Sequence, residues 1–436
     1  MKLNKPVIIL LVVLFTVLAA VVAVPAILST ESAYDNYLKE ARDYNEKNLC
    51  EKAMMAYDNA LAEEDSLDLR IEMAANFKQG LENGEFNSFY KFSNFLFDML
   101  DAYRKEPKAY DTVVQYFFDF GRIEDCVSVI YQAEEFGITT DTVDKVRDEV
   151  RYMCLTSYGS YEDVVMTHED SYLIKNEAYA LYNAKLGSVD GVRYEFATPM
   201  INGFALVKTA EYTFLISEDT VREAYFPEEL TDATGVGDSL IAVKVGEKYK
   251  YYNLAGEVAF GEYDYAGRFA NGIAPVKNGD KWFVIGTDGK QISDKTFEDI
   301  KLSQTNECSQ HGLIFAKSGG KYYLYDASLN KISDTAFDDA DVFMHSNECA
   351  AVKIGDKWGY INSKGEIVIK AQYENAKSFS NGLAGVKDGE FWSFIDADNK
   401  KVITGEYCDV NYFNVNGYCF VKGNNYWYYI MRYYNR

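Results

Sequence analysis

The chain of 436 residues allows two or three domains at ~100–200 residues each. Hydrophobic residues make up 48% of the chain and aromatic residues 15%, which excludes a disordered protein without a core. The formal net charge of −23 repels phosphate backbones, so we expect no nucleic-acid partner; solubility explains the acidity, and binding of a cationic partner is the alternative.

An apolar run over residues 6–28 follows Lys2 and Lys5. The run meets the ~20 residues that a membrane-spanning helix needs and is longer than the ~7–15 residues of a signal-peptide core. Lys before the run and Glu31 after it predict a cytoplasmic N-terminus with the rest of the chain outside. We therefore expect residues 1–30 to be the anchor of a single-pass protein of the cell membrane. Cleavage as a signal peptide, with secretion, is the alternative.

Residues 31–167 are predicted to be helical. Apolar and small residues recur there at steps of three and four, and breaks at 46–48 and 120–122 divide the pattern into helix pairs. Two sets of positions share the same offsets, Ala53/Tyr57/Ala60 and Cys126/Ile130/Ala133. These blocks resemble tetratricopeptide repeats, although Tyr37 and Ala41 replace the Trp and Gly of that family's first helix. The resemblance implies a degenerate helical repeat domain used for protein contact or as a spacer.

The strongest signal is an internal repeat in which a small aliphatic residue precedes Lys. The steps are Val207-Lys208, Val243-Lys244, Val276-Lys277, Ala316-Lys317, Val352-Lys353, Val386-Lys387 and Val421-Lys422. They lie 33 to 40 residues apart, and in all but the first an aromatic residue follows the Lys by five positions. These aromatic residues are Tyr249, Trp282, Tyr322, Trp358, Trp392 and Trp427 and include all 4 Trp. One unit of short strands cannot bury both faces, so the aromatic residues are predicted to pack between stacked units.

The segment 356–365, DKWGYINSKG, carries the repeat signature in full. Its Trp358-Gly359 step opens a strand, and Gly365 fits a tight turn that needs a positive φ. The segment resembles the WG repeat, also called the KWG repeat, of bacterial proteins, and the resemblance covers roughly residues 170–430. It implies an all-β repeat domain with a binding role and no catalytic residues. The residue after the aromatic varies in other units: Phe283, Tyr323 and Ser393.

Both ends of the array carry partial units. Residues 179–187 look like the second half of a unit, and residues 418–430 contain the Val-Lys and Trp strands without the rest. Partial units at opposite ends predict ring closure, with one unit assembled from both ends. We expect an α+β multidomain fold: a transmembrane helix, a tetratricopeptide-like helical region, and an all-β array over 168–436 that forms a propeller-like ring of about seven units. An open β-solenoid is the alternative.

No catalytic, cofactor or metal motif is recognisable. The 3 His, at His168, His311 and His345, lack HExxH spacing and Cys partners at zinc-ligand spacing. The acidic stretches 338–341 and 396–399 offer oxygen ligands for calcium without the full loop pattern, which favours solvated turns. The 7 Cys form no tight pair and are interpreted as small apolar residues, with disulfides as the alternative.

These features predict a non-enzymatic scaffold of a bacterial cell envelope, placed outside the cytoplasm, with no cofactor. Its expected partner is a protein or an envelope component. The N-terminal helix is expected to contact the membrane. A carbohydrate- or cell-wall-binding module is the first alternative, and a hydrolase is the second. The aromatic signature is interpreted as the core between units, so function is expected in the variable loops, including the insertion around 303–312.

Overall fold

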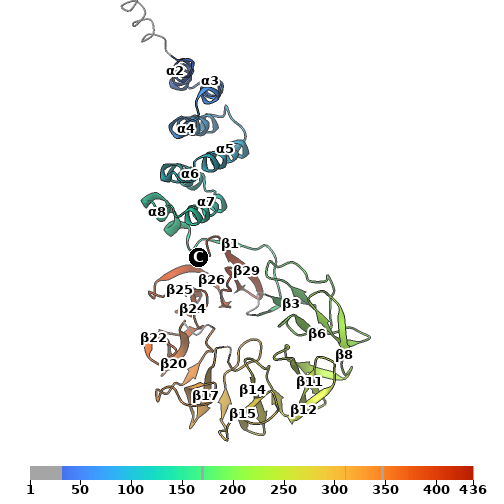
Figure 1. Ribbon diagram of the computed structural model, residues 1–436. Coiled ribbons are helices and arrows are strands. Elements are labelled where there is room, and N and C mark those ends of the chain that lie inside the picture. Colours follow the sequence, from blue (N-terminus) through green and yellow to red (C-terminus); the bar gives the residue numbers. More distant parts are fainter. Residues whose placement is uncertain (1–31, 168–170, 310, 345–347, 436) are drawn as a thin grey trace, which may run out of the picture. The chain divides into compact units, whose positions relative to one another are not determined.

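The computed structural model describes residues 32–167, 171–309, 311–344 and 348–435 (Figure 1). The chain divides into two compact units, one helical up to Val150 and one built of strands from Arg151. The predicted transmembrane segment, residues 1–30, lies outside the described residues. None of the described helices is long and apolar enough to cross a membrane.

Seven helices form the described part of the first unit: α2 (Ala33–Glu46), α3 (Cys50–Glu63), α4 (Leu67–Asn83), α5 (Phe89–Ala102), α6 (Pro107–Asp119), α7 (Ile123–Phe136) and α8 (Asp141–Val150). Ser32, Ser66 and Ser88 cap α2, α4 and α5, because each side chain accepts a backbone N–H of the first turn. The predicted breaks at 46–48 and 120–122 fall between α2 and α3 and between α6 and α7.

Small residues allow the paired helices to approach closely. Ala53 and Ala60 of α3 are fully buried, and the ring of Tyr57 fills the space beside them. Aromatic residues form the next layer, where the rings of Phe77 in α4 and Phe92 in α5 lie 5.5 Å apart. The helical region is therefore a stack of neighbouring pairs, each packed on the next.

The second unit contains eight antiparallel sheets among the described residues, here called blades 1–8. Blades 1 and 2 are β2 (Asp163–Met166), β3 (Tyr172–Asn176), β4 (Ala178–Tyr182), and β5 (Phe196–Ala197), β6 (Phe204–Lys208), β7 (Thr213–Ser217), β8 (Arg222–Tyr225). Blades 3 and 4 are β9 (Leu230–Ala233), β10 (Leu240–Val245), β11 (Lys248–Asn253), β12 (Val258–Tyr263), and β13 (Tyr265–Ala266), β14 (Ile273–Asn278), β15 (Lys281–Gly286).

Blades 5 and 6 are β16 (Asp299–Ile300), β17 (Leu313–Ser318), β18 (Lys321–Asp326), and β19 (Asp339–Ala340), β20 (Ala350–Ile354), β21 (Lys357–Ile361), β22 (Ile367–Tyr373). Blade 7 is β23 (Asn375–Ala376), β24 (Ala384–Lys387), β25 (Trp392–Ile395), β26 (Lys401–Tyr407), and blade 8 is β27 (Asp409–Val410), β28 (Tyr418–Gly423), β29 (Tyr426–Arg432) with β1 (Cys154–Thr156). The blades surround a common centre in a β-propeller, and β12 and β22 lie at its outer edge (Figure 1).

Blade 8 closes the ring because it combines strands from both ends of the second unit. β1 pairs with β29, with Leu155 opposite Met431. Beyond this strand the Ser157 N–H donates to the Tyr429 carbonyl at 2.9 Å, and the Ser157 Oγ accepts the Tyr429 N–H at 3.1 Å. Closure gives the outermost strand of the last blade a partner from the start of the ring, which an open array cannot supply.

The predicted fold class was wrong in the number of units and in the strand that closes the ring. The sequence suggested about seven units, whereas eight blades are described, and the β1–β29 pairing rules out the open solenoid. The missed unit is blade 1, in which Ile174-Lys175 replaces Val-Lys and Tyr179 follows the Lys by four positions. Residues 179–187 belong to this blade. The closing strand is β1, whose three residues are too few to show an alternating pattern.

Strands begin earlier in the chain than the predicted boundary between residues 167 and 168. The last helix ends at Val150, and β1 begins at Cys154. The short strands β1 and β2 stand apart from the repeat signature, which explains why the sequence pattern left them with the helical region.

Candidate functional site

The six predicted aromatic residues all face a repeat Lys across the hairpin of the second and third strands. The pairs are Lys244/Tyr249, Lys277/Trp282, Lys317/Tyr322, Lys353/Trp358, Lys387/Trp392 and Lys422/Trp427. In Lys277/Trp282 and Lys422/Trp427 the ammonium lies 5.8 and 5.6 Å from the ring centroid, as in a cation–π contact. The signature Lys therefore packs against its own blade.

A carboxylate extends this pair in two blades. The hydroxyls of Tyr249 and Tyr322 donate to Asp232 and Asp299, which lie on the first strand of the same blade. Burial, and then the hydrogen bond to the aspartate, raises the pKa of both tyrosines well above the usual value of 10. The signature thus ties the first three strands of a blade together.

The signature rings belong to the apolar clusters of the blades. Trp392 is only 4% exposed, Tyr249 and Tyr322 are also buried, and the remaining three tryptophans are half-buried. None of the 4 Trp, all of which are described, is fully exposed, so these rings contribute to packing within the propeller.

Gly359 fits a close approach between two strands. A Cβ at this position would lie 2.5 Å from the Ile369 carbonyl oxygen and 2.6 Å from the Ala371 nitrogen. The register between β21 and β22 shifts at this point, which brings the backbone of β22 toward β21. Its role is therefore to leave space within blade 6.

One position of the repeat changes its chemistry around the ring. It is the first residue of the loop between the first and second strands, here called the inner loop. Its N–H donates across that loop in every blade, which fixes the equivalent residues: Thr167, Thr198, Thr234, Gly267, Lys301, Asp341, Lys377 and Asn411. In blades 1–3 the residue is Thr, whose Oγ1 also accepts a backbone N–H across the loop. In blades 5–8 it is charged or an amide.

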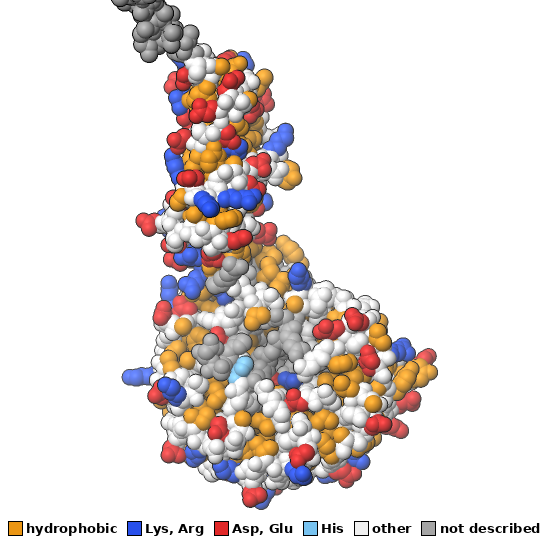
Figure 2. Space-filling view, in the orientation of Figure 1, with side chains coloured by type: hydrophobic (Ala, Val, Ile, Leu, Met, Phe, Trp, Pro, Cys, Tyr) orange, Lys and Arg blue, Asp and Glu red, His pale blue; other side chains and the backbone are white. Residues whose placement is uncertain are grey.

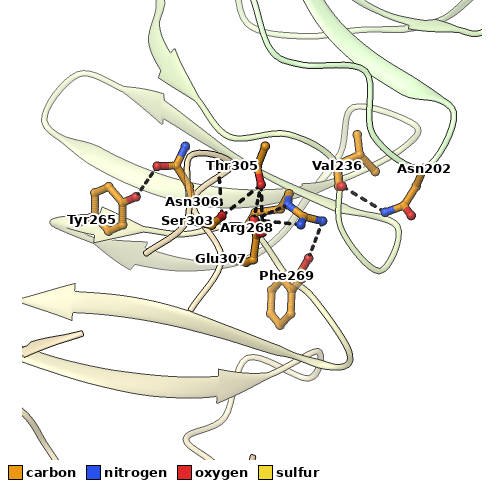
Figure 3. A network of polar contacts seen from close by, with 9 residues as sticks. All are labelled: Asn202, Val236, Tyr265, Arg268, Phe269, Ser303, Thr305, Asn306 and Glu307. Carbon is orange, nitrogen blue, oxygen red and sulfur yellow. Dashed lines mark hydrogen bonds and ion pairs between the residues drawn. The ribbon is translucent and has the colours of Figure 1, made fainter. Parts of the chain in front are cut away.

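The inner loop of blade 5 is the longest, with twelve residues (301–312) against six in blades 2–4. It is anchored to blade 4 by a buried ion pair, in which Arg268 Nη2 lies 2.9 Å from Glu307 Oε2 (Figure 3). The Thr305 hydroxyl contacts both Glu307 carboxylate oxygens, at 2.9 and 2.7 Å. The Asn306 carbonyl accepts the Arg268 N–H at 2.9 Å. These contacts fix one side of the loop.

The other side of this loop reaches blades 1 and 8. The Gln304 side-chain oxygen accepts the Met166 N–H at 3.4 Å, and its amide nitrogen donates to the side-chain oxygen of Asn411. In a ring of eight, blade 1 lies opposite blade 5. The loop therefore spans the centre of the ring.

A cavity of about 320 Å³ lies beside this loop. It is lined by residues of the inner loops of blades 5–8 and by the end of β2 and Thr167 in blade 1. Its polar lining includes Gln304, Asp341, Lys377 and Tyr412, and three of these come from the insertion or from the position that changes its chemistry. This cavity is the candidate functional site.

Asp341 is fully engaged by donors. The Tyr412 hydroxyl lies 2.9 and 2.8 Å from its two oxygens, and the N–H groups of Val342 and Ser378 donate to it at 3.0 and 2.7 Å. Burial, and then the negative charge of Asp341, raises the pKa of the Tyr412 hydroxyl well above 10. Tyr412 therefore remains a neutral donor, and Asp341 links blades 6, 7 and 8.

Lys377 has a different environment. Its ammonium lies 5.9 Å from the Tyr412 ring centroid and 6.0 Å from that of Trp392. Among the described residues no carboxylate lies within ion-pair distance of it, in contrast to Lys301, which pairs with Asp339 at 2.5 Å. Lys377 is thus a lysine with no carboxylate partner at the wall of the cavity.

The residues considered for metal binding do not converge. The first acidic stretch divides its carboxylates: Asp338 pairs with Lys321, Asp339 with Lys301, and Asp341 with Tyr412. Asp396 accepts N–H groups of its own turn. His311 bonds the Met344 carbonyl, whereas His168 and His345 lie outside the described residues. Within the described ranges no three His, Cys, Asp or Glu residues group as metal ligands.

The cysteines are all free, and four of them, Cys50, Cys126, Cys308 and Cys419, are buried. Burial raises the pKa of the Cys308 thiol to about 12, so it stays protonated and inert at neutral pH. These four pack as small apolar side chains, as the sequence suggested.

Sequence reasoning pointed to the insertion around 303–312, and the structure places part of it in the cavity wall. It missed Lys377 and Tyr412 and treated Asp341 as a turn residue. The signal that could have found them is the alignment of the inner loops, where Thr198 and Thr234 correspond to Asp341 and Lys377.

A sequence profile described as the WG containing repeat matches residues 251–282, 324–358, 358–390 and 392–427. The predicted resemblance is therefore confirmed at four places. Each match begins in the third strand of one blade. Three of the four end in the third strand of a following blade, and the match 358–390 ends in the turn just before β25, so the profile unit is offset from the blade. No curated protein matches the sequence.

Solved structures similar to this chain include Hsv2 of Kluyvelomyces marxianus, with 10% identity over 56% of this chain and 99% of that one, at a TM-score of 0.34. The β-propeller domain of Cps50 (Swd1) of Myceliophteria thermophila has 10% identity over 64% and 98%, at a TM-score of 0.32. The TPR2AB domain of yeast Sti1, in a pHSP90 complex, has 16% identity over 27% and 46%, at a TM-score of 0.22. At these scores the likeness carries no conclusion about this chain.

Proposed function

We propose, from the premise that the chain carries WG repeats in a β-propeller, that it is a non-enzymatic scaffold whose propeller binds a protein partner. The observation that carries this is an exposed aromatic pair at the edge of blade 2. Tyr212 and Tyr225 are 44% and 60% exposed, and their rings lie 5.7 Å apart. Tyrosine on a rigid edge offers a large contact area at low entropic cost, which favours protein recognition.

The apolar surface continues along the edge. Val221, next to β8, is 53% exposed, and Val258 of β12 is 55% exposed. Blades 2 and 3 are close here, since a Cβ on Gly256 would lie 2.3 Å from the Tyr225 carbonyl oxygen. Acidic, basic and hydrophobic side chains are interspersed over the visible face of the propeller (Figure 2). The edge formed by Tyr212, Val221, Tyr225 and Val258, here called the tyrosine edge, is the proposed contact.

The proposal includes a location outside the cytoplasm, as part of a cell envelope. The apolar run at 6–28, preceded by two lysines, supports export of the remaining chain. Protease treatment of intact cells tests this location. Degradation of the propeller without cell lysis is expected, and complete protection would contradict it.

The test of partner binding uses the full chain as bait. Partners retained by cross-linking are identified, purified and titrated against the unmodified chain and against the double substitution Tyr212→Ser/Tyr225→Ser. We expect binding to weaken about tenfold or more, because exposed aromatic anchors carry much of an interface's energy. The matched control is Tyr158→Ser, at a fully exposed tyrosine elsewhere in the second compact unit. It should leave the affinity for the partner unchanged.

Equal binding by both variants would remove the tyrosine edge from the interface. Turnover of a hydrolysable envelope component by the purified chain would contradict the non-enzymatic part of the proposal.

A further inference from the structure

We propose that the central cavity of the propeller binds a small organic anion with an apolar body, held by the Lys377 ammonium. This site is separate from the tyrosine edge and does not depend on a protein partner. Its volume of about 320 Å³ falls at the lower end of ligand pockets in proteins. A small ligand, rather than a peptide or a sugar chain, fits this space.

The cavity is a local departure from the regular repeat. The inner loops of blades 2–4 have six residues each, and none of their residues lines it. The twelve-residue loop of blade 5 and the nine-residue loop of blade 6 (341–349) both contribute to its wall. Because the two longest inner loops are adjacent and line the same space, the insertion and the cavity belong together.

The side-chain acceptors around the cavity already have donors, so the groups that lack a partner are donors. The Asp341 oxygens already accept hydrogen bonds from the Tyr412 hydroxyl and from the N–H groups of Val342 and Ser378. The Gln304 side-chain oxygen receives the Met166 N–H. These acceptors have no need of a ligand, so a cationic or donor-rich molecule gains little here.

Two donors remain without an acceptor. The Lys377 ammonium has no carboxylate partner among the described residues. The Asn411 side chain, 2% exposed, has its Nδ2 buried with no hydrogen-bond partner there. The Gln304 oxygen accepts the Met166 N–H, so the Gln304 amide nitrogen must donate to Asn411. The Asn411 atom that meets Gln304 is therefore the oxygen, which fixes the orientation of the Asn411 amide. A buried amide donor without an acceptor costs stability. Asn411 is not among the residues that line the cavity, so the Lys377 ammonium is the donor that a ligand there would meet.

The rest of the lining suits a hydrocarbon body. It includes six apolar side chains: Met166, Leu302, Val342, Met344, Phe413 and Val415. The chain as a whole carries a net charge of −23, so a general affinity for anions is not expected. Anion binding would therefore depend on Lys377, and apolar burial would select an organic anion over inorganic phosphate.

The test titrates the full chain with sodium hexanoate, following heat by calorimetry and fluorescence of the tryptophans. Trp392 lies 6.0 Å from the Lys377 ammonium and reports on the site. We expect saturable binding of hexanoate, weaker binding of inorganic phosphate, and none of hexan-1-ol or hexylamine at the same concentration. Lys377→Met should weaken hexanoate binding about tenfold or more, through loss of a charged hydrogen bond.

Lys400→Gln, an exposed lysine in the turn of the same blade, is the matched control and should bind as the unmodified chain does. Should Lys377→Met lose its fold, a hexanoate-dependent rise in the melting temperature of the unmodified chain decides the question. Equal affinity in Lys377→Met and the unmodified chain would overturn the proposal. So would the absence of saturable hexanoate binding up to about 10 mM, a weak-binding limit near 3 kcal/mol, or equal binding of hexylamine.

Discussion

Blades 1–3 and blades 6–8 place different side chains at the same backbone position, the first residue of the inner loop. In blades 1–3 the hydroxyl of a threonine accepts a backbone N–H of its own blade. Thr198, for example, accepts the Leu206 N–H at 2.9 Å. In blades 6–8 the side chains of Asp341 and Asn411 bond other blades, and Lys377 lies at the cavity wall. The same position therefore stabilises its own blade in blades 1–3, here called the regular arc. In blades 6–8, here called the cavity arc, it faces the centre of the ring.

The difference indicates how a repeat acquires a site without losing its fold. The backbone hydrogen bond of this position is present in all eight blades, so the loop geometry does not depend on the side chain. The side chain is then free to vary, provided that buried polar atoms find partners. Four substitutions, from the largest expected effect to the smallest, test how far the two arcs differ.

Arg268→Met is expected to have the largest effect, because it removes the anchor of the long loop at the border between the arcs. Glu307, only 1% exposed, would keep the Thr305 hydroxyl but lose its buried cation. The expected loss is about 3–5 kcal/mol of unfolding free energy, measured by urea denaturation. Adding Glu307→Gln removes the stranded charge and should recover part of it. A loss below about 1 kcal/mol would mean that the loop is held from the cavity side instead.

Tyr412→Phe tests the links between blades 6 and 8. The substitution removes the hydroxyl that contacts both Asp341 oxygens, while two backbone N–H donors stay in place. We expect a loss of about 1.5–3 kcal/mol, as for a hydrogen bond to a charged group. Tyr426→Phe, at a tyrosine 53% exposed at the start of β29, is the matched control and should change stability by less than about 0.5 kcal/mol.

Thr198→Val tests the regular arc. Thr198 is buried, and its hydroxyl accepts the Leu206 N–H at 2.9 Å, so valine leaves that N–H without its side-chain acceptor. The expected loss is about 1–2 kcal/mol, confined to blade 2 and measured by denaturation and by faster hydrogen exchange at Leu206. Thr198→Ser keeps the hydroxyl and should retain the slow exchange. Unchanged exchange in the valine variant would show that the hydroxyl is dispensable.

Much of the fold follows from the sequence, because the signature fixes local geometry. The Lys and aromatic residues five positions apart face each other across a hairpin, and the spacing of 33 to 40 residues gives one blade per step. Blade 1 escaped notice because Ile174 replaces valine and the aromatic residue is shifted by one position. The closing strand escaped notice because its partner lies about 275 residues away, and pairing at that distance leaves no local pattern.

The cavity was predictable only in part. The insertion at 303–312 stood out by its length, but a loop's length does not reveal where it points. Its direction comes from the Arg268–Glu307 pair, which joins it to the preceding blade, and from Gln304, which contacts blades 1 and 8, both distant in sequence. Lys377 resembles any exposed lysine in the sequence, and only the ring brings it to the cavity wall.

Lys377→Thr gives blade 7 the residue of the regular arc and should have the smallest effect on stability, within about 0.5 kcal/mol. The backbone already matches, since the Lys377 N–H donates to Gly385 as the Thr198 N–H donates to Leu206. A threonine hydroxyl would gain the opportunity to accept the Gly385 N–H, whereas the loss of the ammonium removes the proposed anchor of an anion. Urea denaturation and hexanoate titration of the same variant separate the two roles. Near-native stability with weakened binding would confirm that this position is free to serve the cavity, and a large loss of stability would show that both arcs use it for the fold.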